Sequence, residues 1–452
     1  MIWIATLAWV PFAWAEDPPL VDPASPAHAA SSAGLVADPG PISVVPSDAD
    51  ILSLFESKAD NLVIGGHIYL RFDSSVGAAI DQRYAAFSSP NQLGLFADVR
   101  PTGSDHGGLR VYAAARVFHD FTVESGDADP YGYALEPTTV QLDEVWLKAD
   151  VARRLYVTIG RQRIRWGSGR FWNPTDFLNS TTRPPLELYD DRPGVGLVKL
   201  HLPVGASNFY ALADFEGASQ PEDLIGAARA EIVAGPAEIA LSGAVRGDER
   251  LQLGADVSAG LGPFDAHAEG AVRHGDPAPY WQGEMTSDTV PTREDRTSDW
   301  IPQIVTGLEV GIRYGNDDTL YVGGEYFWND AGYPDTELHA WLLLKQDYIP
   351  LFVGRNYVSA YVHLPAPGRL NDAAFTASWI ANLSDGSDLA RLDVHWTVLK
   401  RLLLTAYGTA HFGNDGELNF ALEVPAIEGV LDEAISVREP PFGIGVGAAV
   451  EF

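Results

Sequence analysis

The sequence predicts an all-β fold, a transmembrane antiparallel up-and-down β-barrel of about 18 strands, with 16 also compatible. Apolar and polar residues alternate with a period of two through most of the chain, which is the pattern of strands with two different faces. The connections between these segments alternate between short and long, as the turns and external loops of membrane barrels do. No run of 18 or more apolar residues occurs, which excludes a helical membrane protein.

The last strand shows the pattern most clearly. Residues 442–452 read FGIGVGAAVEF, and they place Ile444, Val446, Ala448, Val450 and Phe452 on one face. The other face holds Gly443, Gly445, Gly447, Ala449 and Glu451. A closing strand that ends at an aromatic residue resembles that of Gram-negative outer-membrane β-barrels, and this resemblance implies recognition of Phe452 by the barrel-assembly machinery. The alternative is the edge strand of a soluble sandwich.

The composition suits one large barrel and limits the chemistry. The chain has 452 residues, 46% of them hydrophobic, a formal net charge of -31 and no cysteine. The absence of cysteine removes disulfides, thiolate metal sites and cysteine nucleophiles. The acidic excess argues against a nucleic-acid partner, which requires a basic face. It is compatible with a cation-attracting lumen or surface, or simply with a solvated exterior.

The first 60 residues precede the strand pattern. Residues 1–15 are apolar and end in Ala13-Trp14-Ala15, which predicts a signal peptide, although no basic residue comes before the apolar core. The true start could therefore lie upstream of Met1. Residues 16–60 are rich in Pro, Ala, Ser and Asp, and we expect a disordered periplasmic leader. A short helix over 50–59, in the barrel mouth, and the tail of a linker are both compatible with this composition. The barrel is predicted to span 61–452.

Charged residues occupy one face of the predicted strands, and in a membrane barrel that face lines a wet lumen. The lumen-facing candidates are His67, Arg71, Asp256, His267, Glu269, Glu309, Arg313, Arg391, Asp393 and His395. Aromatic residues are expected near the external rim at Phe72 and Phe412, and near the periplasmic rim at Phe264 and Trp396. Residues 337–344 read as a helix within a loop, since an additional strand would break the even strand number.

The densest cluster of charged and aromatic residues lies in 155–192. Its run Gly160-Arg161-Gln162, Trp166-Gly167 and Asn173-Pro174-Thr175-Asp176 resembles a loop of porin-like and polysaccharide-export barrels of Gram-negative bacteria. The resemblance covers this loop closely and the rest of the chain only in architecture. It implies a third external loop that folds inward as a constriction. The candidate constriction residues are Arg161, Arg163, Arg165, Arg170, Asp176, Asp190 and Asp191. The alternative is a packed lid held shut by Arg–Asp pairs.

Strand parity places Ile159 on the same face as Arg161, Arg163 and Arg165. An arginine at the lipid midplane costs about 2–4 kcal/mol, so these residues cannot continue a lipid-facing row. Either the strand leaves the membrane near Gly160, or a bulge at Gly160 reverses its register.

No enzymatic activity, metal or cofactor is expected. The sequence has no Gly-x-Ser-x-Gly nucleophile motif, and its histidines are spread over separate strands without metal-ligand spacing. We expect an outer-membrane, porin-like channel for passive or weakly selective passage of small hydrophilic solutes. The alternative is a closed or gated barrel that acts as a surface anchor, receptor or export partner for polysaccharide. The expected partners are outer-membrane lipid, the assembly machinery and the solute or polysaccharide. The sequence does not decide between a monomer and a homotrimer, which many porins form.

Overall fold

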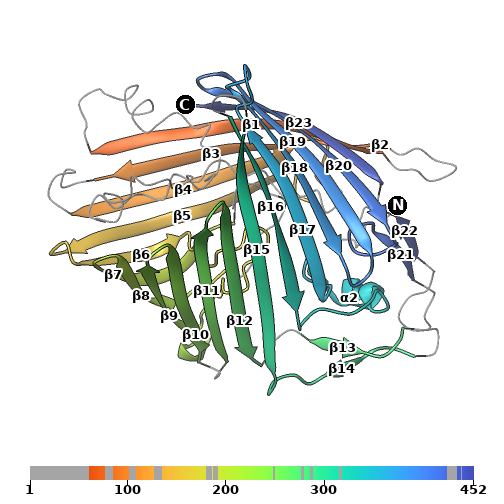
Figure 1. Cartoon of the computed structure of the whole chain (residues 1–452), viewed down its shortest axis with the longest axis horizontal. Helices are drawn as coiled ribbons and strands as arrows, with labels where there is room; N and C mark the ends of the chain where they lie inside the picture. The colour runs from red at the N-terminus through yellow and green to blue at the C-terminus, as the bar shows by residue number, and fades with distance from the viewer. Residues whose placement is uncertain are drawn as a thin grey trace.

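The computed structural model describes residues 61–76, 85–100, 108–126, 135–179, 186, 192–247, 250–275, 279–285, 289–314, 318–424, 435–438 and 440–452. The predicted signal peptide, the leader, and the candidates Asp190 and Asp191 lie outside these residues. The described strands form a closed antiparallel barrel of 18 strands (Figure 1). The all-β barrel prediction, with 18 rather than 16 strands, is therefore confirmed.

The barrel strands follow one another around the wall in chain order. They are β1 (Leu62–Val76), β3 (Pro90–Val99), β4 (Leu109–Asp120), β5 (Thr138–Val151), β6 (Leu155–Gln162), β7 (Val195–Val204), β8 (Ser207–Asp214), β9 (Ile225–Ala234), β10 (Ala237–Arg246), β11 (Leu251–Leu261), β12 (Phe264–His274), β15 (Trp300–Tyr314), β16 (Asp318–Asn329), β17 (Asn356–Pro365), β18 (Ala373–Asn382), β19 (Ser387–Leu399), β20 (Leu402–Gly413) and β23 (Phe442–Glu451). The short β2 (Ala85–Ser88) pairs with the far end of β1.

The last strand closes the barrel against the first. β23 pairs with β20 on one side and with β1 on the other. The terminal residue takes part in this closure, because the N–H of Phe452 donates to the carbonyl of Gly66 and the N–H of Gly66 donates to the carbonyl of Phe452, both at 3.0 Å. Closure leaves no free sheet edge, which is the condition for crossing a bilayer with strands.

The two faces of the sheet have opposite chemistry. On β1, Ile68 is 44% exposed while the adjacent Tyr69 is 3% exposed, and on β19 Leu392 is 52% exposed while Arg391 is 7% exposed. Apolar side chains therefore cover the outside of the barrel, and polar side chains point inward. A soluble sandwich would bury its apolar face, so this arrangement is that of a transmembrane barrel with an apolar belt in the lipid. No helix in the part of the chain that the structure describes is long and apolar enough to span a membrane.

The aromatic residues expected at the two rims, Phe72, Phe412, Phe264 and Trp396, are all exposed on the outer face. Exposed aromatic rings on the outer face of a membrane barrel are typical of the bilayer interface.

The long connections carry the remaining elements. The hairpin of β13 (Tyr280–Gln282) and β14 (Thr292–Glu294), the helix α2 (His339–Lys345) and the hairpin of β21 (Ala421–Val424) and β22 (Ile435–Arg438) gather at the end opposite the C-terminus (Figure 1). A turn of 3-10 helix, η3 (Pro221–Asp223), lies between β8 and β9. The expected helix within a loop is confirmed as α2, so the strand number stays even.

Candidate pore lining

The third long connection, residues 163–194, is called loop L3 below, and its path begins where β6 ends. β6 stays in register with β5 as far as Arg161, so no bulge reverses the strand at Gly160. The second of the two alternatives, a bulge at Gly160, is therefore wrong, and the strand ends at Gln162. Gly160 has φ 125°, and a side chain there would place its Cβ 2.2 Å from the carbonyl oxygen of Val145. Glycine is thus required at this position, which lies inside β6 and two residues before the strand ends.

Two carboxylates of the inner wall hold L3. Glu269 on β12 accepts hydrogen bonds from the backbone N–H of Ser168 (2.9 Å), of Gly169 (3.3 Å) and of Thr175 (2.7 Å), and from the Thr175 hydroxyl (2.8 Å). A carboxylate suits this position because an unpaired backbone N–H buried away from water is costly.

Glu325 on β16 is the second anchor. It accepts from the backbone N–H of Phe171 at 2.8 Å and from that of Arg170. His267 of β12 lies 2.9 Å from the same carboxylate through its Nε2. Residues 168–175 of the loop are therefore fixed against the inner wall at two strands, β12 and β16.

Apolar packing fills the space between L3 and the wall. One cluster joins the loop to strands β7 to β12; it contains Ile164, Trp166, Phe177 and Leu178 of L3 with Leu197, Leu212, Ala227, Ala244 and Ala271. A second cluster extends along β15 to β19 and contains Phe171 and Trp172 with Val305, Phe327, Tyr357, Ile380 and Leu389. These wall residues are apolar although they face the lumen. Polar residues therefore do not line the inner wall where the loop packs against it.

The candidate arginines fall in different places. Arg161 lies at the strand end, where its guanidinium pairs with Glu216 and donates to the carbonyl of Gly194 at 3.1 Å. Arg163 lies 3.8 Å from Glu144 of β5. Arg165 is exposed, and no ion pair forms to it from the described residues.

Arg170 lies against the wall of β15 and β17. Its guanidinium carbon is 3.9 Å from the ring centroid of Tyr361, and its Nη1 is 3.9 Å from the carboxylate of Glu309. The Tyr361 hydroxyl donates to Glu309. The cation thus rests on an aromatic face beside a carboxylate that a phenol holds in place.

Asp176 is a packing group of the loop. Its carboxylate pairs with Arg192 at 2.8 Å, and both side chains are buried. It also accepts from the side-chain amide of Asn179 at 2.6 Å. Asp176 therefore does not face the other arginines across open lumen, and for this residue the structure favours the packing alternative.

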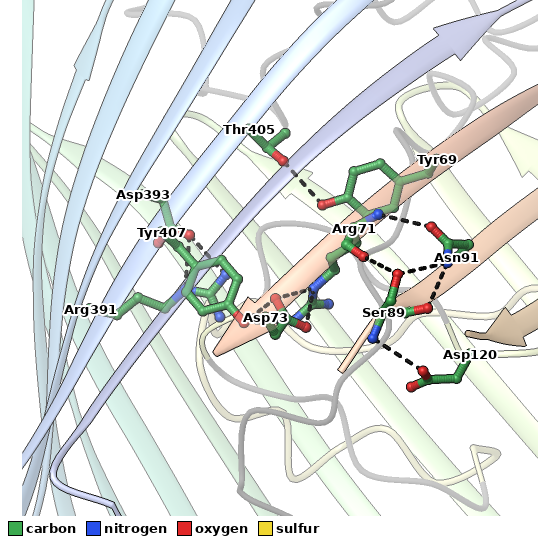
Figure 2. A network of polar contacts seen from close by, with 10 residues as sticks. All are labelled: Tyr69, Arg71, Asp73, Ser89, Asn91, Asp120, Arg391, Asp393, Thr405 and Tyr407. Carbon is green, nitrogen blue, oxygen red and sulfur yellow. Dashed lines mark hydrogen bonds and ion pairs between the residues drawn. The ribbon is translucent and has the colours of Figure 1, made fainter. Parts of the chain in front are cut away.

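A polar network joins β1, β19 and β20 across the closing strand (Figure 2). Arg71 pairs with Asp73 at 2.8 Å and donates to the Tyr407 hydroxyl at 2.8 Å. Arg391, paired with Asp393 at 2.8 Å, lies over the same tyrosine ring at 4.4 Å from its centroid. These contacts reach over β23, whose inward face carries glycine and alanine.

The same network continues where β1 parts from β3 (Figure 2). The Arg71 N–H donates to the side chain of Asn91 at 3.2 Å, and the Ser89 hydroxyl donates to the Arg71 carbonyl at 3.0 Å. The Ser89 N–H donates to Asp120 at 3.1 Å. Side chains thus replace the ladder hydrogen bonds lost at Ser89, between β2 and β3.

The remaining lumen-facing candidates lie on the strand face opposite the apolar outer side chains. Asp256 pairs with Arg229 at 2.8 Å, and the His67 ring lies 2.8 Å from the side-chain amide of Gln92. His395 is buried, and Arg313 is exposed near the end of β15. Sequence reasoning missed Arg116 and Asp143, which pair at 2.6 Å between β4 and β5. Among the described residues, no group of three or more His, Cys, Asp or Glu side chains could hold a metal ion.

Comparisons with known proteins address the fold. No protein-family model matches the sequence. No curated protein matches it either. Among solved structures, OccAB3 of Acinetobacter baumannii aligns with a TM-score of 0.50 at 11% identity, covering 86% of this chain and 99% of that one. OccK11 (OpdR) of Pseudomonas aeruginosa aligns at 0.46 with 9% identity, covering 86% and 96%. A mutant of Rh. blastica porin aligns at 0.42 with 10% identity, covering 86% and 100%.

The fold and the apolar belt define a class of protein. The chain is an outer-membrane-type β-barrel with the architecture of a porin. At this level of identity the likeness concerns the fold alone, so the function has to be argued from the lumen.

Proposed function

We propose that the protein is an outer-membrane channel for passive or weakly selective passage of small hydrophilic solutes, with L3 as its constriction. The observation that carries the proposal is the anchoring of L3 inside the barrel by Glu269 and Glu325. An 18-stranded barrel is wide enough for an aqueous channel, so a loop fixed across part of the lumen narrows a pore that would otherwise be large.

Polar side chains on the wall beside the described part of L3 support passage rather than closure. The described part of the loop packs its apolar side chains on β7 to β12 and β15 to β19, whereas the wall of β1 and β3 to β5 carries polar side chains such as Arg71, Arg116 and Asp143. Arg163, Arg165 and Arg170 leave L3 as partly or fully exposed side chains. Solute selection would come from these charges and from the width beside the loop.

The absence of cysteine from the chain makes a direct test available. Arg165→Cys places one thiol on the exposed part of L3, and reaction with a bulky cationic methanethiosulfonate should reduce single-channel conductance. Glu222→Cys, in the external loop between β8 and β9, is the matched control, and its labelling should leave the conductance unchanged. Equal responses of the two variants would contradict a constriction at L3.

Aromatic residues near the arginines of L3 would favour the alternative, a closed or gated barrel serving polysaccharide, if their ring faces were open to stack on sugars. Trp166, Phe171 and Trp172 are 5%, 2% and 0% exposed, because they pack against the wall. Their faces are therefore occupied by protein and unavailable for sugar stacking. If the folded barrel carried no current in a planar bilayer, this result would favour the closed or gated barrel.

Two proposed partners follow from the outer surface. The apolar belt would contact outer-membrane lipid, and the terminal strand with Phe452 would be read by the barrel-assembly machinery. Deletion of Phe452 should reduce the amount of folded barrel in the membrane, measured by heat-modifiable migration. A homotrimer would be detected by cross-linking of the purified barrel in detergent.

A further inference from the structure

The segment of residues 414–420, which follows β20, folds back against the barrel and is called the strap below. Its Leu418 is 0% exposed and belongs to the second apolar cluster described above, together with Trp172 of L3. The Leu418 N–H donates to the Ser387 hydroxyl at 2.9 Å, and the Leu418 carbonyl accepts from the ring of His411 at 2.7 Å. The strap is therefore docked on the same side of the barrel as L3.

The strap carries a buried carboxylate, Glu417, which is 0% exposed. Glu417 accepts from the Tyr357 hydroxyl at 2.5 Å and from the side-chain amide of Asn382 at 2.9 Å. It also accepts from the backbone N–H of Leu351. Among the described residues no cation pairs with this carboxylate. Burial without a counter-ion disfavours the ionised form and raises the pKa of Glu417 from 4.5 to about 8. The docked strap therefore favours protonated Glu417.

Leu351, in the loop between α2 and β17, connects the strap to L3. Its N–H donates to Glu417, and its carbonyl accepts from the indole N–H of Trp172 at 3.1 Å. Leu351 has φ 65°, in the left-handed region that residues other than glycine rarely adopt. This conformation is thus held from one side by the strap and from the other by L3. Tyr357 makes a second link, since its hydroxyl donates to Glu417 and its ring lies 5.6 Å from that of Trp172.

We propose that the strap positions L3 through Leu351 while Glu417 is protonated, and that it releases one edge of L3 when Glu417 ionises. This inference rests on the proposed channel function and adds its regulation. Glu417 is a positioning residue, because it acts on the constriction only through Leu351 and Trp172. On release, Leu351 can leave the left-handed region, and its hydrogen bond to Trp172 is lost. L3 stays anchored at Glu269 and Glu325, so the constriction widens without leaving the wall.

Other titratable and charged groups surround the strap. They are Asp385, which accepts from the Glu417 N–H at 2.8 Å, Tyr357, Tyr348 and His339 of the neighbouring elements, His411 of β20, and the exposed pair of Asp415 with Arg438. The charge of Asp385 adds to the effect of burial on Glu417. Aspartate, histidine and tyrosine ordinarily titrate near pH 3.9, 6.5 and 10. Comparison with Glu417→Gln at each pH cancels what these groups contribute.

The test records single-channel current while the pH is raised on the side of the strap. Wild-type protein should switch between a narrow level and a wider, noisier level. The ratio of time in the wide level to time in the narrow level should rise about tenfold per pH unit between about pH 5 and about pH 8, and then level off. Glu417→Gln has no proton to lose and should keep a constant ratio. Glu337→Gln, at an exposed glutamate before α2, is the matched control and should keep the wild-type profile.

Thiol labelling follows the strap independently of current, because the chain has no other cysteine. Leu418→Cys should react faster with an impermeant methanethiosulfonate as the pH rises. Its rate divided by that of Leu418→Cys/Glu417→Gln cancels the ionisation of the thiol, and this quotient should rise with pH. Trp172→Phe removes the indole N–H that binds Leu351. In this background the quotient should still rise, whereas the pH dependence of the conductance should be lost. If Glu417→Gln folds poorly, Glu417→Asp keeps an ionisable group and should keep a pH-dependent current.

The outcomes distinguish this inference from the channel function itself. A conducting Glu417→Gln channel with the wild-type pH profile would overturn the role of Glu417 and leave the channel standing. A labelling quotient that rises with pH while the wild-type current stays constant would overturn the coupling of the strap to L3. Absence of current at every pH from a folded, heat-modifiable barrel would overturn the proposed channel, and labelling of Leu418→Cys would still report on the strap.

Discussion

The anchoring of L3 can be tested by Glu269→Ala. This substitution removes the acceptor of three backbone N–H groups and one hydroxyl at once. A hydrogen bond to a charged group contributes about 1.5–3 kcal/mol, and water in the lumen will replace part of what is lost. We therefore estimate that docking of L3 onto β12 weakens by about 3 kcal/mol, while Glu325 still holds the loop at β16.

The expected result is a loop that detaches at one edge. Single-channel current should become noisier and larger on average, and liposome swelling should extend to larger neutral oligosaccharides. Glu269→Gln should be intermediate, because its amide oxygen still accepts hydrogen bonds. Glu238→Ala is the control, since this exposed glutamate of β10 makes no described contact with L3. Wild-type conductance, noise and size limit in Glu269→Ala would refute the anchoring argument.

Two further predictions concern closure and pH. Gly445→Ala should lower the yield of folded barrel, because its Cβ would lie 2.2 Å from the Tyr407 ring, whereas Gly270→Ala meets no atom within 4 Å and should fold normally on a heat-modifiability gel. Burial raises the pKa of Glu417, in the loop after β20, from 4.5 to about 8, so the protonated form is favoured while that loop is docked. Docking should be strongest below about pH 4.5 and weaken by at most about 5 kcal/mol as pH rises to about 8. Hydrogen exchange of the Leu351 amide, which donates to Glu417, should accelerate over this range beyond the intrinsic rate, and Glu417→Gln should abolish the excess.

The sequence predicted what depends on local periodicity. Alternation identified the apolar outer face, for example Ile68 beside Tyr69, and the aromatic terminus identified the strand that closes the barrel. The even strand number and the helix in its loop followed from the same pattern. These features depend on residues that are close together in the chain, so they can be predicted from a single sequence.

The lumen depends on contacts that periodicity does not record. Arg71 and Tyr407 are 336 positions apart, and they meet only because β23 closes the barrel with a bare inner face. The sequence shows the glycines of β23, but it does not show that they leave room for side chains of the neighbouring strands. Phe327 and Val305 break the polar-inward rule because L3 covers them, which strand parity alone cannot predict.

Parity also fails at bulges. A register shift between β4 and β5 lies at Ala114/Ala115, opposite Asp143 and Glu144. Both of these adjacent carboxylates face inward, since one pairs with Arg116 and the other accepts from the Trp146 indole at 3.0 Å. Strict alternation would have placed one of them in the lipid. The contact of Glu144 with Arg163 therefore could not be predicted from the sequence pattern.

The most direct test of the central claim is single-channel current of the refolded protein in a planar bilayer under a salt gradient. An open pore narrowed by L3 predicts stepwise, ohmic conductance. The sign of the reversal potential then shows whether the exposed arginines of L3 or the acidic side chains of the barrel dominate the selectivity. A folded, heat-modifiable barrel that passes no current would contradict the channel function and favour a closed barrel.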